Sequence, residues 1–480
     1  MDGKLTPARC ASRPVPQSPL HWIGSGRILP KGKPVRDEGP RVAPPLTEDY
    51  HVATMNSQES SLRFHHHAAF LGLCLLWAMF CPVLSAQDLP SAQPEEIGLS
   101  PRRLERLDQA MQRYVDEGRV AGLVTLILRQ GKVAHRGVYG YLRKDRGLPM
   151  REDAVFRIAS QTKALTSVAV MMLQEDGKLL LSDPVGRYIP EFRHTTVAET
   201  AEDGSLRVVP ARRPITVRDL LTHTSGLSYG FGPAARAYAF EGIQGWFFAN
   251  RNEPIGNLVR RLASLPFDAH PGNQWIYGFS SDVLGHLVEV VSGLPLDEFF
   301  QSRICAPLKM VDTHFFLPPE KIERFTPVYG LDENRSLYLV EDPDTSPYVQ
   351  EPRRCFSGGA GLLSTARDYA RFLQALLNGG ELENARILSR KSVELMTVNH
   401  VGDLYAPQGF GLGFWVTEDL GASGEPGSVG SFGWGGAYHT VYWVDPREEL
   451  VAVLMCQLLP ARDSDLHARF RAMVYQALAD

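Results

Sequence analysis

The stretch RIASQTKALTSVAVMMLQEDGKL, residues 157–179, decides the fold because it predicts a helix without a solvent-facing side. From Leu165 to Gln174, apolar or small residues occupy nearly every position around the helix, so no stripe is left for water. Gly177 follows as a typical helix-ending residue. We therefore expect a fully buried central helix that other elements must cover.

Ser160 and Lys163 lie in the first turn of this predicted helix. Residues three positions apart share one face, so their side chains can touch. A helix N-terminus also offers free backbone N–H groups and a positive dipole end. The lysine can take the serine proton, and the Ser160 N–H can help to hold an oxyanion. Spacing alone leaves a second interpretation open, in which Ser160 only caps the helix and Lys163 extends towards solvent.

A second serine lies in GLSYG, residues 226–230, which matches the G-x-S-x-G pattern of a hydrolase nucleophile. That pattern needs a sharp turn between a strand and a helix. The preceding stretch, residues 214–223, instead predicts a short helix with Thr216 as N-cap and Asp219 as its capping-box partner. Glycines and a proline follow, which favours a loop. The neighbourhood therefore argues against Ser228 as the nucleophile.

The N-terminal part of the chain predicts a helix followed by a β-hairpin. Ser100 is a suitable N-cap, and Pro101 suits the first helical position. Four apolar residues recur on one face of this helix: Leu104, Leu107, Met111 and Tyr114. Two β-rich runs, GLVTLILR and KVAHRGVYGY, then meet at Gln130-Gly131, which is typical of a hairpin turn.

The C-terminal part repeats this pattern in reverse order. Strands are predicted at 410–416, 439–444 and 450–456, before a closing helix. The apolar face of that helix carries Leu466, Phe470, Val474 and Ala477. The simplest architecture is an α/β (α+β) fold. One antiparallel sheet is built from both termini and flanked by helices, and a mostly helical subdomain is inserted from the middle.

This architecture predicts one catalytic domain over residues 87–480. Its sheet subdomain comprises residues 97–158 and 350–480, and its helical subdomain comprises residues 159–349. Active-site chemistry is expected where the two subdomains meet.

The composition excludes several kinds of partner. Among 480 residues the net charge is −4, so there is no electrostatic case for nucleic acid. After residue 87 the only cysteines are Cys305, Cys355 and Cys456, without C-x-x-C spacing. Neither a disulfide framework nor a zinc site is indicated, and we predict no metal or organic cofactor. These cysteines are expected to be small core residues.

The first 86 residues differ from the rest of the chain. Residues 1–54 are proline-rich and lack apolar periodicity, which predicts a disordered extension or a start codon placed too early. Residues 55–86 resemble a secretory signal peptide, with an apolar region from Ala68 to Phe80 and small residues before a cleavage point after Ala86. The protein is therefore expected to be secreted or periplasmic. An uncleaved membrane anchor is the alternative.

Several segments in a fixed order resemble the serine β-lactamase and penicillin-binding-protein superfamily. They are S-x-x-K at 160–163, LLTHTSGL at 220–227, 271–293, SGGAGLLSTARDYARFLQALLNGG at 357–380, and GWGGAYHTVYWVDP at 433–446. The resemblance covers residues 97–480. Within the superfamily the chain looks most like the β-lactamase-like carboxylesterases, also called family VIII esterases.

The resemblance implies roles for individual residues. Ser160 would be the nucleophile and Lys163 its general base or proton relay. Tyr277 occupies the place of the tyrosine in the Y-x-N element and could exchange protons with Ser160 or the leaving group. Trp434-Gly435-Gly436 falls where β-lactamases carry K-T-G. Its glycines would let a substrate carbonyl approach, and the Ala437 N–H would be the second oxyanion donor.

Two departures from the family pattern bear on the substrate. Trp434 and Gly435 replace the lysine and threonine that bind the carboxylate of a β-lactam, and no lysine follows Lys391. Phe279 replaces the asparagine of Y-x-N. Losing these polar partners should weaken the binding of carboxylate-bearing substrates. A pocket edged by Trp434 and Phe279 would instead favour apolar acyl and alcohol groups.

The sequence therefore predicts a secreted serine hydrolase that cleaves small carboxylic esters through an acyl-Ser160 intermediate. Alternatives are a β-lactamase or D-alanyl-D-alanine peptidase, an acyltransferase, and an inactive cell-wall-binding scaffold. Neither a nucleic acid nor a membrane partner beyond the signal segment is expected, and the oligomeric state stays open. The irregular segments Val197 to Arg213 and Gly230 to Asn252 are predicted to set specificity.

Overall fold

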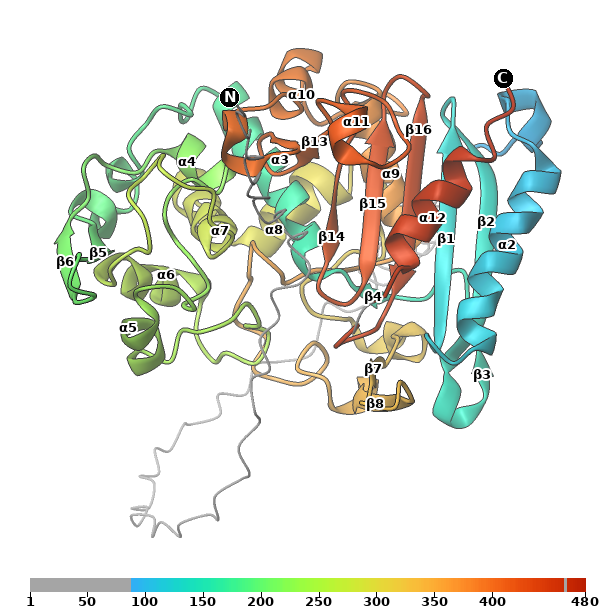
Figure 1. Ribbon diagram of the computed structural model, residues 1–480, viewed down its shortest axis with the longest axis horizontal. Coiled ribbons are helices and arrows are strands. Elements are labelled where there is room, and N and C mark those ends of the chain that lie inside the picture. The colour runs from blue at the N-terminus through green and yellow to red at the C-terminus, as the bar shows by residue number, and fades with distance from the viewer. Residues whose placement is uncertain (1–87, 462–463) are drawn as a thin grey trace, which may run out of the picture. The chain divides into compact units, whose positions relative to one another are not determined.

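Strands from both ends of the chain form one antiparallel sheet (Figure 1). The computed structural model describes residues 88–461 and 464–480, and within them this sheet has eight strands. In spatial order they are β12 (Gly409–Phe410), β13 (Trp415–Val416), β14 (Phe432–Gly436), β15 (Thr440–Asp445), β16 (Leu450–Cys456), β1 (Gly122–Arg129), β2 (Lys132–Arg143) and β3 (Leu148–Pro149). The predicted sheet built from both termini is confirmed.

The first and last long strands pair at the centre of the sheet. β1 runs antiparallel to β16, so that Leu123 faces Cys456. Every residue of both strands is buried, because helices cover both faces. The turn at Gln130-Gly131 has positive φ angles of 52° and 73°, as a tight two-residue hairpin turn requires. The predicted hairpin between β1 and β2 is confirmed.

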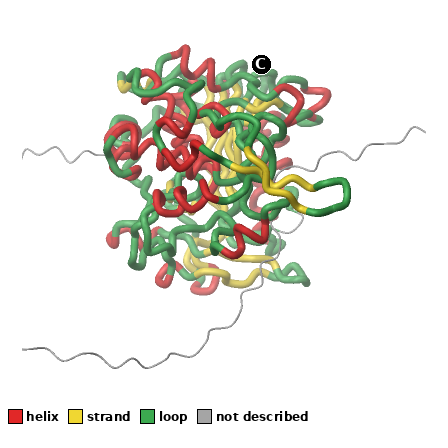
Figure 2. Tube along the Cα trace, turned by 90° about the vertical axis from the view of Figure 1, so that its left-hand side faces the viewer, coloured by secondary structure: helices red, strands yellow, loops and turns green. Residues whose placement is uncertain are grey.

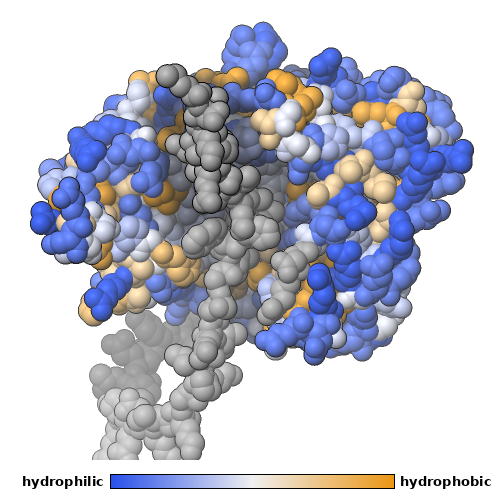
Figure 3. Space-filling model, in the orientation of Figure 1, coloured by the Kyte–Doolittle hydropathy of each residue, from blue (hydrophilic) through white to orange (hydrophobic). Residues whose placement is uncertain are grey.

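Helices lie on both faces of the sheet. α2 (Pro101–Asp116) and α12 (Leu466–Tyr475) pack together on one face, where Leu107 and Phe470 are fully buried. The outward side of α2 is hydrophilic (Figure 3). α9 (Ala366–Leu377) packs against β1 and β16 on the other face. The two terminal helices predicted from their apolar stripes are confirmed.

The central helix is α3 (Thr162–Glu175), and each of its residues from Thr162 to Leu173 is buried. Gly177 follows it with a φ of 69°, so the predicted buried helix and its end are confirmed. α7 packs along α3. The other helices are α4 (Val217–Leu221), α5 (Ala235–Phe240), α6 (Ile255–Ser264), α7 (Ser280–Ser292), α8 (Leu296–Phe300), α10 (Arg390–Met396) and α11 (Leu420–Ser423).

Two hairpins lie within the part of the chain predicted to be helical. The segment from Val197 to Arg213 was expected to be irregular, but β5 (Thr196–Thr200) and β6 (Leu206–Pro210) pair there. This hairpin stands out from the surface that faces the viewer in Figure 2. β7 (Val328–Leu331) and β8 (Leu337–Glu341) form the second hairpin. Its Tyr329 N–H donates to the Gln457 carbonyl at 3.1 Å, which attaches this hairpin to the end of β16.

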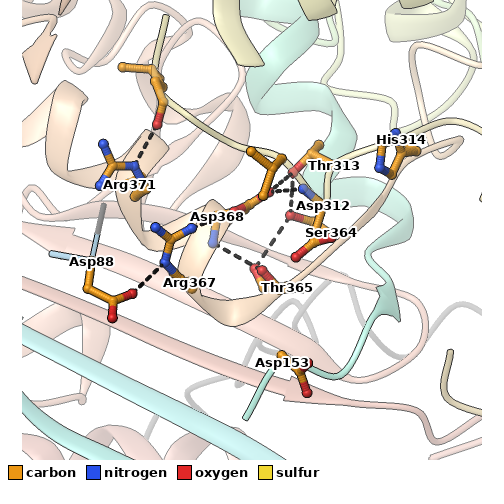
Figure 4. A network of polar contacts seen from close by, with 12 residues as sticks. Asp88, Asp153, Asp312, Thr313, His314, Ser364, Thr365, Arg367, Asp368 and Arg371 are labelled. Carbon is orange, nitrogen blue, oxygen red and sulfur yellow. Dashed lines mark hydrogen bonds and ion pairs between the residues drawn. The ribbon is translucent and has the colours of Figure 1, made fainter. Parts of the chain in front are cut away.

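A polar network at the start of α9 fixes the corner between this helix and β9 (Leu363–Ser364) (Figure 4). Buried Asp368 accepts hydrogen bonds from the Asp312 N–H at 2.6 Å and from Thr313 Oγ1 at 3.1 Å. Burial raises the pKa of Asp368 to about 6. β9 pairs with β4 (Phe156–Arg157), so the network supports the strand that leads towards α3. A small hairpin, β10 (Glu381–Leu382) and β11 (Ala385–Arg386), follows α9.

The predicted N-terminal extension, residues 1–54, and the signal segment, residues 55–86, lie outside the described residues. Within residues 88–461 and 464–480, none of the helices combines the length and the apolar character needed to cross a bilayer. Cys305, Cys355 and Cys456 are free and buried, as predicted, and burial raises the pKa of each thiol.

Candidate active site

Ser160 lies in a 3₁₀ turn, Ala159–Gln161, between β4 and α3. The sequence placed it in the first helical turn, whereas α3 itself begins at Thr162. Ala159 has a φ of +42°, a left-handed conformation that costs a non-glycine residue about 1–3 kcal/mol and needs support from its surroundings. That support includes a 3.1 Å hydrogen bond from the Ile158 N–H to the Leu362 carbonyl.

Arg157 anchors the strand just before this turn. Its side chain is fully buried and forms a 2.6 Å ion pair with Glu341 of β8. The Gln457 amide donates to the Arg157 carbonyl at 2.9 Å, which ties the same strand to the end of β16. The Arg157 guanidinium also lies 4.0 Å from the centre of the Phe325 ring. Arg157 was not among the predicted site residues, because its role depends on segments distant in the chain.

Lys163 holds its terminal nitrogen beside the hydroxyl of Ser160. Its side chain is almost fully buried, and Nζ lies 3.3 Å from Ser160 Oγ. Nζ also donates to the Gly359 carbonyl at 2.7 Å and to the Tyr229 hydroxyl at 3.1 Å. A neutral amine has two N–H bonds and one lone pair, so it can keep these two partners and accept the Ser160 proton. The structure thus brings together the serine and the lysine predicted from S-x-x-K.

Asp282 positions the carbonyl group that receives Lys163. Its carboxylate accepts hydrogen bonds from Ser357 Oγ at 2.6 Å and from the Gly359 N–H at 3.1 Å. Burial raises the pKa of Asp282, and the nearby charge of Lys163 partly opposes this rise. Asp282 is therefore a buried acidic neighbour of the lysine. Asp282 falls within the segment 271–293 that carries the family resemblance, but no role was predicted for it.

Two tyrosines, not one, lie beside Lys163. Tyr277, predicted as the catalytic tyrosine, presents its ring to Nζ at 4.6 Å from the ring centre, and its hydroxyl accepts a 3.1 Å hydrogen bond from Trp434 Nε1. The tyrosine oxygen bonded to Lys163 belongs instead to Tyr229. Burial and the neighbouring Tyr277 phenol raise the pKa of Tyr229 well above its usual value. Tyr229 directly follows Ser228, the serine that the sequence argued against as the nucleophile. Its place within that G-x-S-x-G match was the signal in the sequence that could have pointed to Tyr229.

Trp434 belongs to an aromatic cluster around Tyr277. Its ring centre lies 5.5 Å from that of Tyr277 and 5.5 Å from that of Phe410. Trp275 and Tyr405 complete this cluster, with ring centres 4.5 Å apart. Aromatic side chains therefore occupy the position where the family pattern has a lysine.

Gly436 lets β14 approach the turn that carries Ser160. A Cβ atom at Gly436 would lie 2.4 Å from the Ile158 carbonyl oxygen, closer than real contacts allow. At Gly435 the nearest atom would be the Thr440 carbonyl oxygen, at 3.1 Å. Ala437 follows in the turn between β14 and β15 and packs beside Ala159 and Tyr438. The strand end predicted to bind substrate thus contacts the residues that flank Ser160.

Comparisons with known proteins agree with this arrangement. The β-lactamase family model matches residues 107–476. The chain belongs to the β-lactamase family. The superfamily resemblance inferred from the sequence is confirmed.

Several relatives of this β-lactamase-family protein are esterases or acyltransferases by name. It is 33% identical to esterase EstB of Burkholderia gladioli over 367 residues, which cover 73% of this chain and 89% of EstB. It is 32% identical to monacolin J acid methylbutanoyltransferase of Aspergillus terreus over 359 residues, 68% of this chain and 83% of that protein. The solved structure of EstCE1, a hydrolase with promiscuous acyltransferase activity, matches with a TM-score of 0.67 at 28% identity, covering 78% of this chain and 98% of EstCE1.

Phe279 has a different place from the one expected. It was predicted to edge the substrate pocket, but its side chain is fully buried. Its ring lies 5.0 Å from the Tyr229 ring, edge to face, and stacks on Phe248 at 5.6 Å. Phe279 immediately precedes α7, which directs it into the core. It therefore supports Tyr229 and does not form a pocket edge.

Ser228 plays a local structural role in this β-lactamase-family protein. Its hydroxyl accepts a 3.0 Å hydrogen bond from the Gly230 N–H. The helix before it is α4, capped as predicted by Thr216 with reciprocal bonds to Asp219. A helix therefore leads into this loop, as expected. Within the described part of the chain, no group of three or more His, Cys, Asp or Glu side chains could hold a metal ion.

Proposed function

We propose that this protein is a secreted serine hydrolase that cleaves small carboxylic esters through an acyl-Ser160 intermediate. The observation that carries the proposal is the 3.3 Å contact between Ser160 Oγ and Lys163 Nζ, with Nζ also held by Gly359 and Tyr229. A nucleophile beside an oriented base is the arrangement that covalent catalysis needs. The signal-like segment 55–86 supports secretion.

In the proposed acylation step, Ser160 Oγ bonds to the ester carbonyl carbon while its proton passes to the neutral Lys163 amine. The bond from this carbon to the alcohol oxygen then breaks, and the leaving oxygen takes the proton through Tyr229 or Tyr277. In deacylation, water bonds to the acyl carbon and gives one proton to the Lys163 amine, the bond to Oγ breaks, Oγ takes that proton back, and the carboxylic acid leaves. The N–H groups of Ser160 and Ala437 are proposed to stabilise the oxyanion in both steps.

The aromatic cluster around Trp434 favours an ester over a β-lactam. Trp434 and Gly435 supply neither the cation nor the hydroxyl that would pair with a substrate carboxylate. A carboxylate left without a partner in an apolar site loses much of its binding energy. EstB, which is 33% identical to this chain, is named an esterase.

Acyl transfer is a second candidate, because two relatives carry that activity in their names or titles. The same acyl-serine would serve both reactions, and the nature of the second nucleophile, water or an alcohol, would decide between them. Adding an alcohol acceptor to an ester assay tests this point, since transfer produces a new ester where hydrolysis produces only acid.

A side-by-side rate comparison on p-nitrophenyl esters of rising acyl length and on nitrocefin tests the proposed function. We expect ester turnover that is lost in Ser160→Ala and kept in Ser228→Ala, with nitrocefin turned over far more slowly. Faster turnover of nitrocefin than of any ester would contradict the ester proposal. Turnover of neither substrate class would favour an inactive scaffold.

A further inference from the structure

The strand that leads to Ser160 has different partners on its two sides. One side of β4 pairs with β9. On the other side, Val155 bonds to neighbouring backbone, because its N–H donates to the Arg324 carbonyl at 2.8 Å and its carbonyl accepts from the Thr326 N–H at 3.0 Å. Alternate residues of a strand direct their backbone groups to the same side, so Arg157 faces this side too. Its partner there is a side chain.

Gln457, the residue directly after β16, supplies that side chain. Its carboxamide oxygen accepts from the Arg157 N–H at 3.2 Å, and its Nε2 donates to the Arg157 carbonyl at 2.9 Å. Nε2 also donates to the Cys456 carbonyl at 2.7 Å, and Arg157 Nη1 donates to the carboxamide oxygen at 3.5 Å. A carboxamide has two donor and two acceptor positions, so these four contacts use all of them. The Gln457 side chain therefore takes the place of a neighbouring strand.

The next residue, Leu458, is bonded to the other part of the site. Its N–H donates to the Tyr438 carbonyl at 3.0 Å. Tyr438 directly follows Ala437, the predicted second oxyanion donor. The Arg157 guanidinium lies 6.0 Å from the centre of the Tyr438 ring, so the two attachments are close together. Two adjacent residues at the end of β16 thus hold both the strand that leads to Ser160 and the turn that carries Ala437.

The short connection from Arg157 to Ser160 transmits any displacement of the strand. Only Ile158 and Ala159 lie between them, and Ala159 keeps its left-handed φ of +42°. A strained conformation of this kind persists only where the flanking structure holds it. An oxyanion donor is effective only at a fixed distance from the carbonyl that the nucleophile attacks. The backbone of Arg157 must therefore be held in place for Ser160 to act.

We infer that Gln457 is a positioning residue that fixes Ser160 relative to the Ala437 N–H. Gln457 acts through the backbone of Arg157 and contacts no reacting atom. The ion pair with Glu341 holds the side chain of Arg157, whereas Gln457 holds its N–H and carbonyl groups. This inference rests on the proposed acyl-Ser160 mechanism.

Gln457→Met tests the inference, because methionine keeps the length of the side chain but lacks both hydrogen-bonding atoms of the carboxamide. We expect kcat for p-nitrophenyl butyrate to fall by about 10- to 100-fold, since a misplacement of about 1 Å typically costs about 100-fold. KM should change by less than about threefold, because the lost interaction matters mainly in the transition state. Rates are expressed per active site, counted from the final extent of labelling by a fluorophosphonate probe.

Inhibition by butylboronic acid gives a readout that a purely structural role would not move. Ser160 Oγ bonds to boron while its proton passes to Lys163, so the tetrahedral adduct carries a negative charge as the transition state does. For Gln457→Met we expect the Ki of butylboronic acid to rise by about the factor by which kcat falls. Gln457→Glu keeps the size of the side chain but removes the donor to the Arg157 carbonyl, and it should change kcat and Ki in the same direction.

Gln374→Met is the matched control. Gln374 is also a buried glutamine, 1% exposed against 6% for Gln457. Its Nε2 donates to Asn378 Oδ1 at 2.8 Å at the end of α9, away from the strand that leads to Ser160. Loss of this bond should lower the thermal unfolding midpoint, while kcat and the boronic acid Ki stay within about twofold of the unmodified protein.

The outcomes separate this inference from the proposed function. A folded, labelled Gln457→Met variant with unchanged kcat and unchanged boronic acid Ki would overturn the inference alone. A lower kcat without a weaker boronic acid complex would also overturn it, because Gln457 would then not position the tetrahedral state. If Gln457→Met does not fold, the same two results are read from Gln457→Glu. Absence of both ester cleavage and labelling in the unmodified protein would overturn the proposed function and, with it, this inference.

Discussion

Replacing Gly436 by alanine places a methyl group against the backbone that precedes Ser160. The added Cβ would lie 2.4 Å from the Ile158 carbonyl oxygen, whereas ordinary contacts begin at 3.4 Å. β14 and the Ser160 turn must therefore separate by about 1 Å, a misplacement that typically costs about 100-fold in rate. We expect kcat/KM for p-nitrophenyl butyrate to fall by about that factor, equivalent to about 2.7 kcal/mol of transition-state stabilisation.

Steady-state kinetics and thermal unfolding measured on the same preparation separate this effect from misfolding. Gly421→Ala is the control, because the same methyl group in exposed α11 meets only the Asp419 side chain, at 3.2 Å. We expect this control to keep its activity. Retention of kcat/KM within twofold in Gly436→Ala would refute the reasoning, because the close approach of β14 would then not position Ser160.

Three further changes test other parts of the account. Tyr229→Phe removes one partner of Lys163 and should lower kcat by about 100-fold; an unchanged kcat would exclude Tyr229 from the proton path. Asp282→Ala leaves the Gly359 N–H without its acceptor and should lower the free energy of unfolding, measured in urea, by about 1–3 kcal/mol; equal stability would show that this contact is dispensable. Burial lowers the pKa of His467 from its usual 6.5 to about 4, so as the pH falls this imidazole takes up its proton in the unfolded chain before it does so in the folded protein. Stability should therefore decrease from pH 6.5 to pH 4 by up to about 3 kcal/mol from this group. His467→Gln should flatten that part of the stability profile, and an identical profile would show that His467 does not contribute.

The sheet and its covering helices could be predicted because their signals are local. The apolar stripe of α2, the turn at Gln130-Gly131 and the all-round apolar character of α3 are each visible within one short window. The β5–β6 hairpin was missed although Asp203-Gly204 separates its two strands. The residues around this turn have a loop-like composition, which concealed the short alternation of apolar and polar residues in the two strands.

The site was predicted only in part, because its geometry depends on distant segments. Ser160 and Lys163 are one turn apart, so their contact follows from local structure alone. The contact between Tyr229 and Lys163 instead depends on how the loop after α4 closes over α3. For Phe279, sequence order gives the position, but the packing of α7 decides that the ring turns into the core.

Labelling by a fluorophosphonate probe, with the modified peptide identified by mass spectrometry, tests the central claim most directly. If Lys163 activates Ser160, the adduct lies on Ser160, disappears in Ser160→Ala and persists in Ser228→Ala. An adduct on Ser228, or labelling that survives Ser160→Ala, would contradict the claim that Ser160 is the nucleophile.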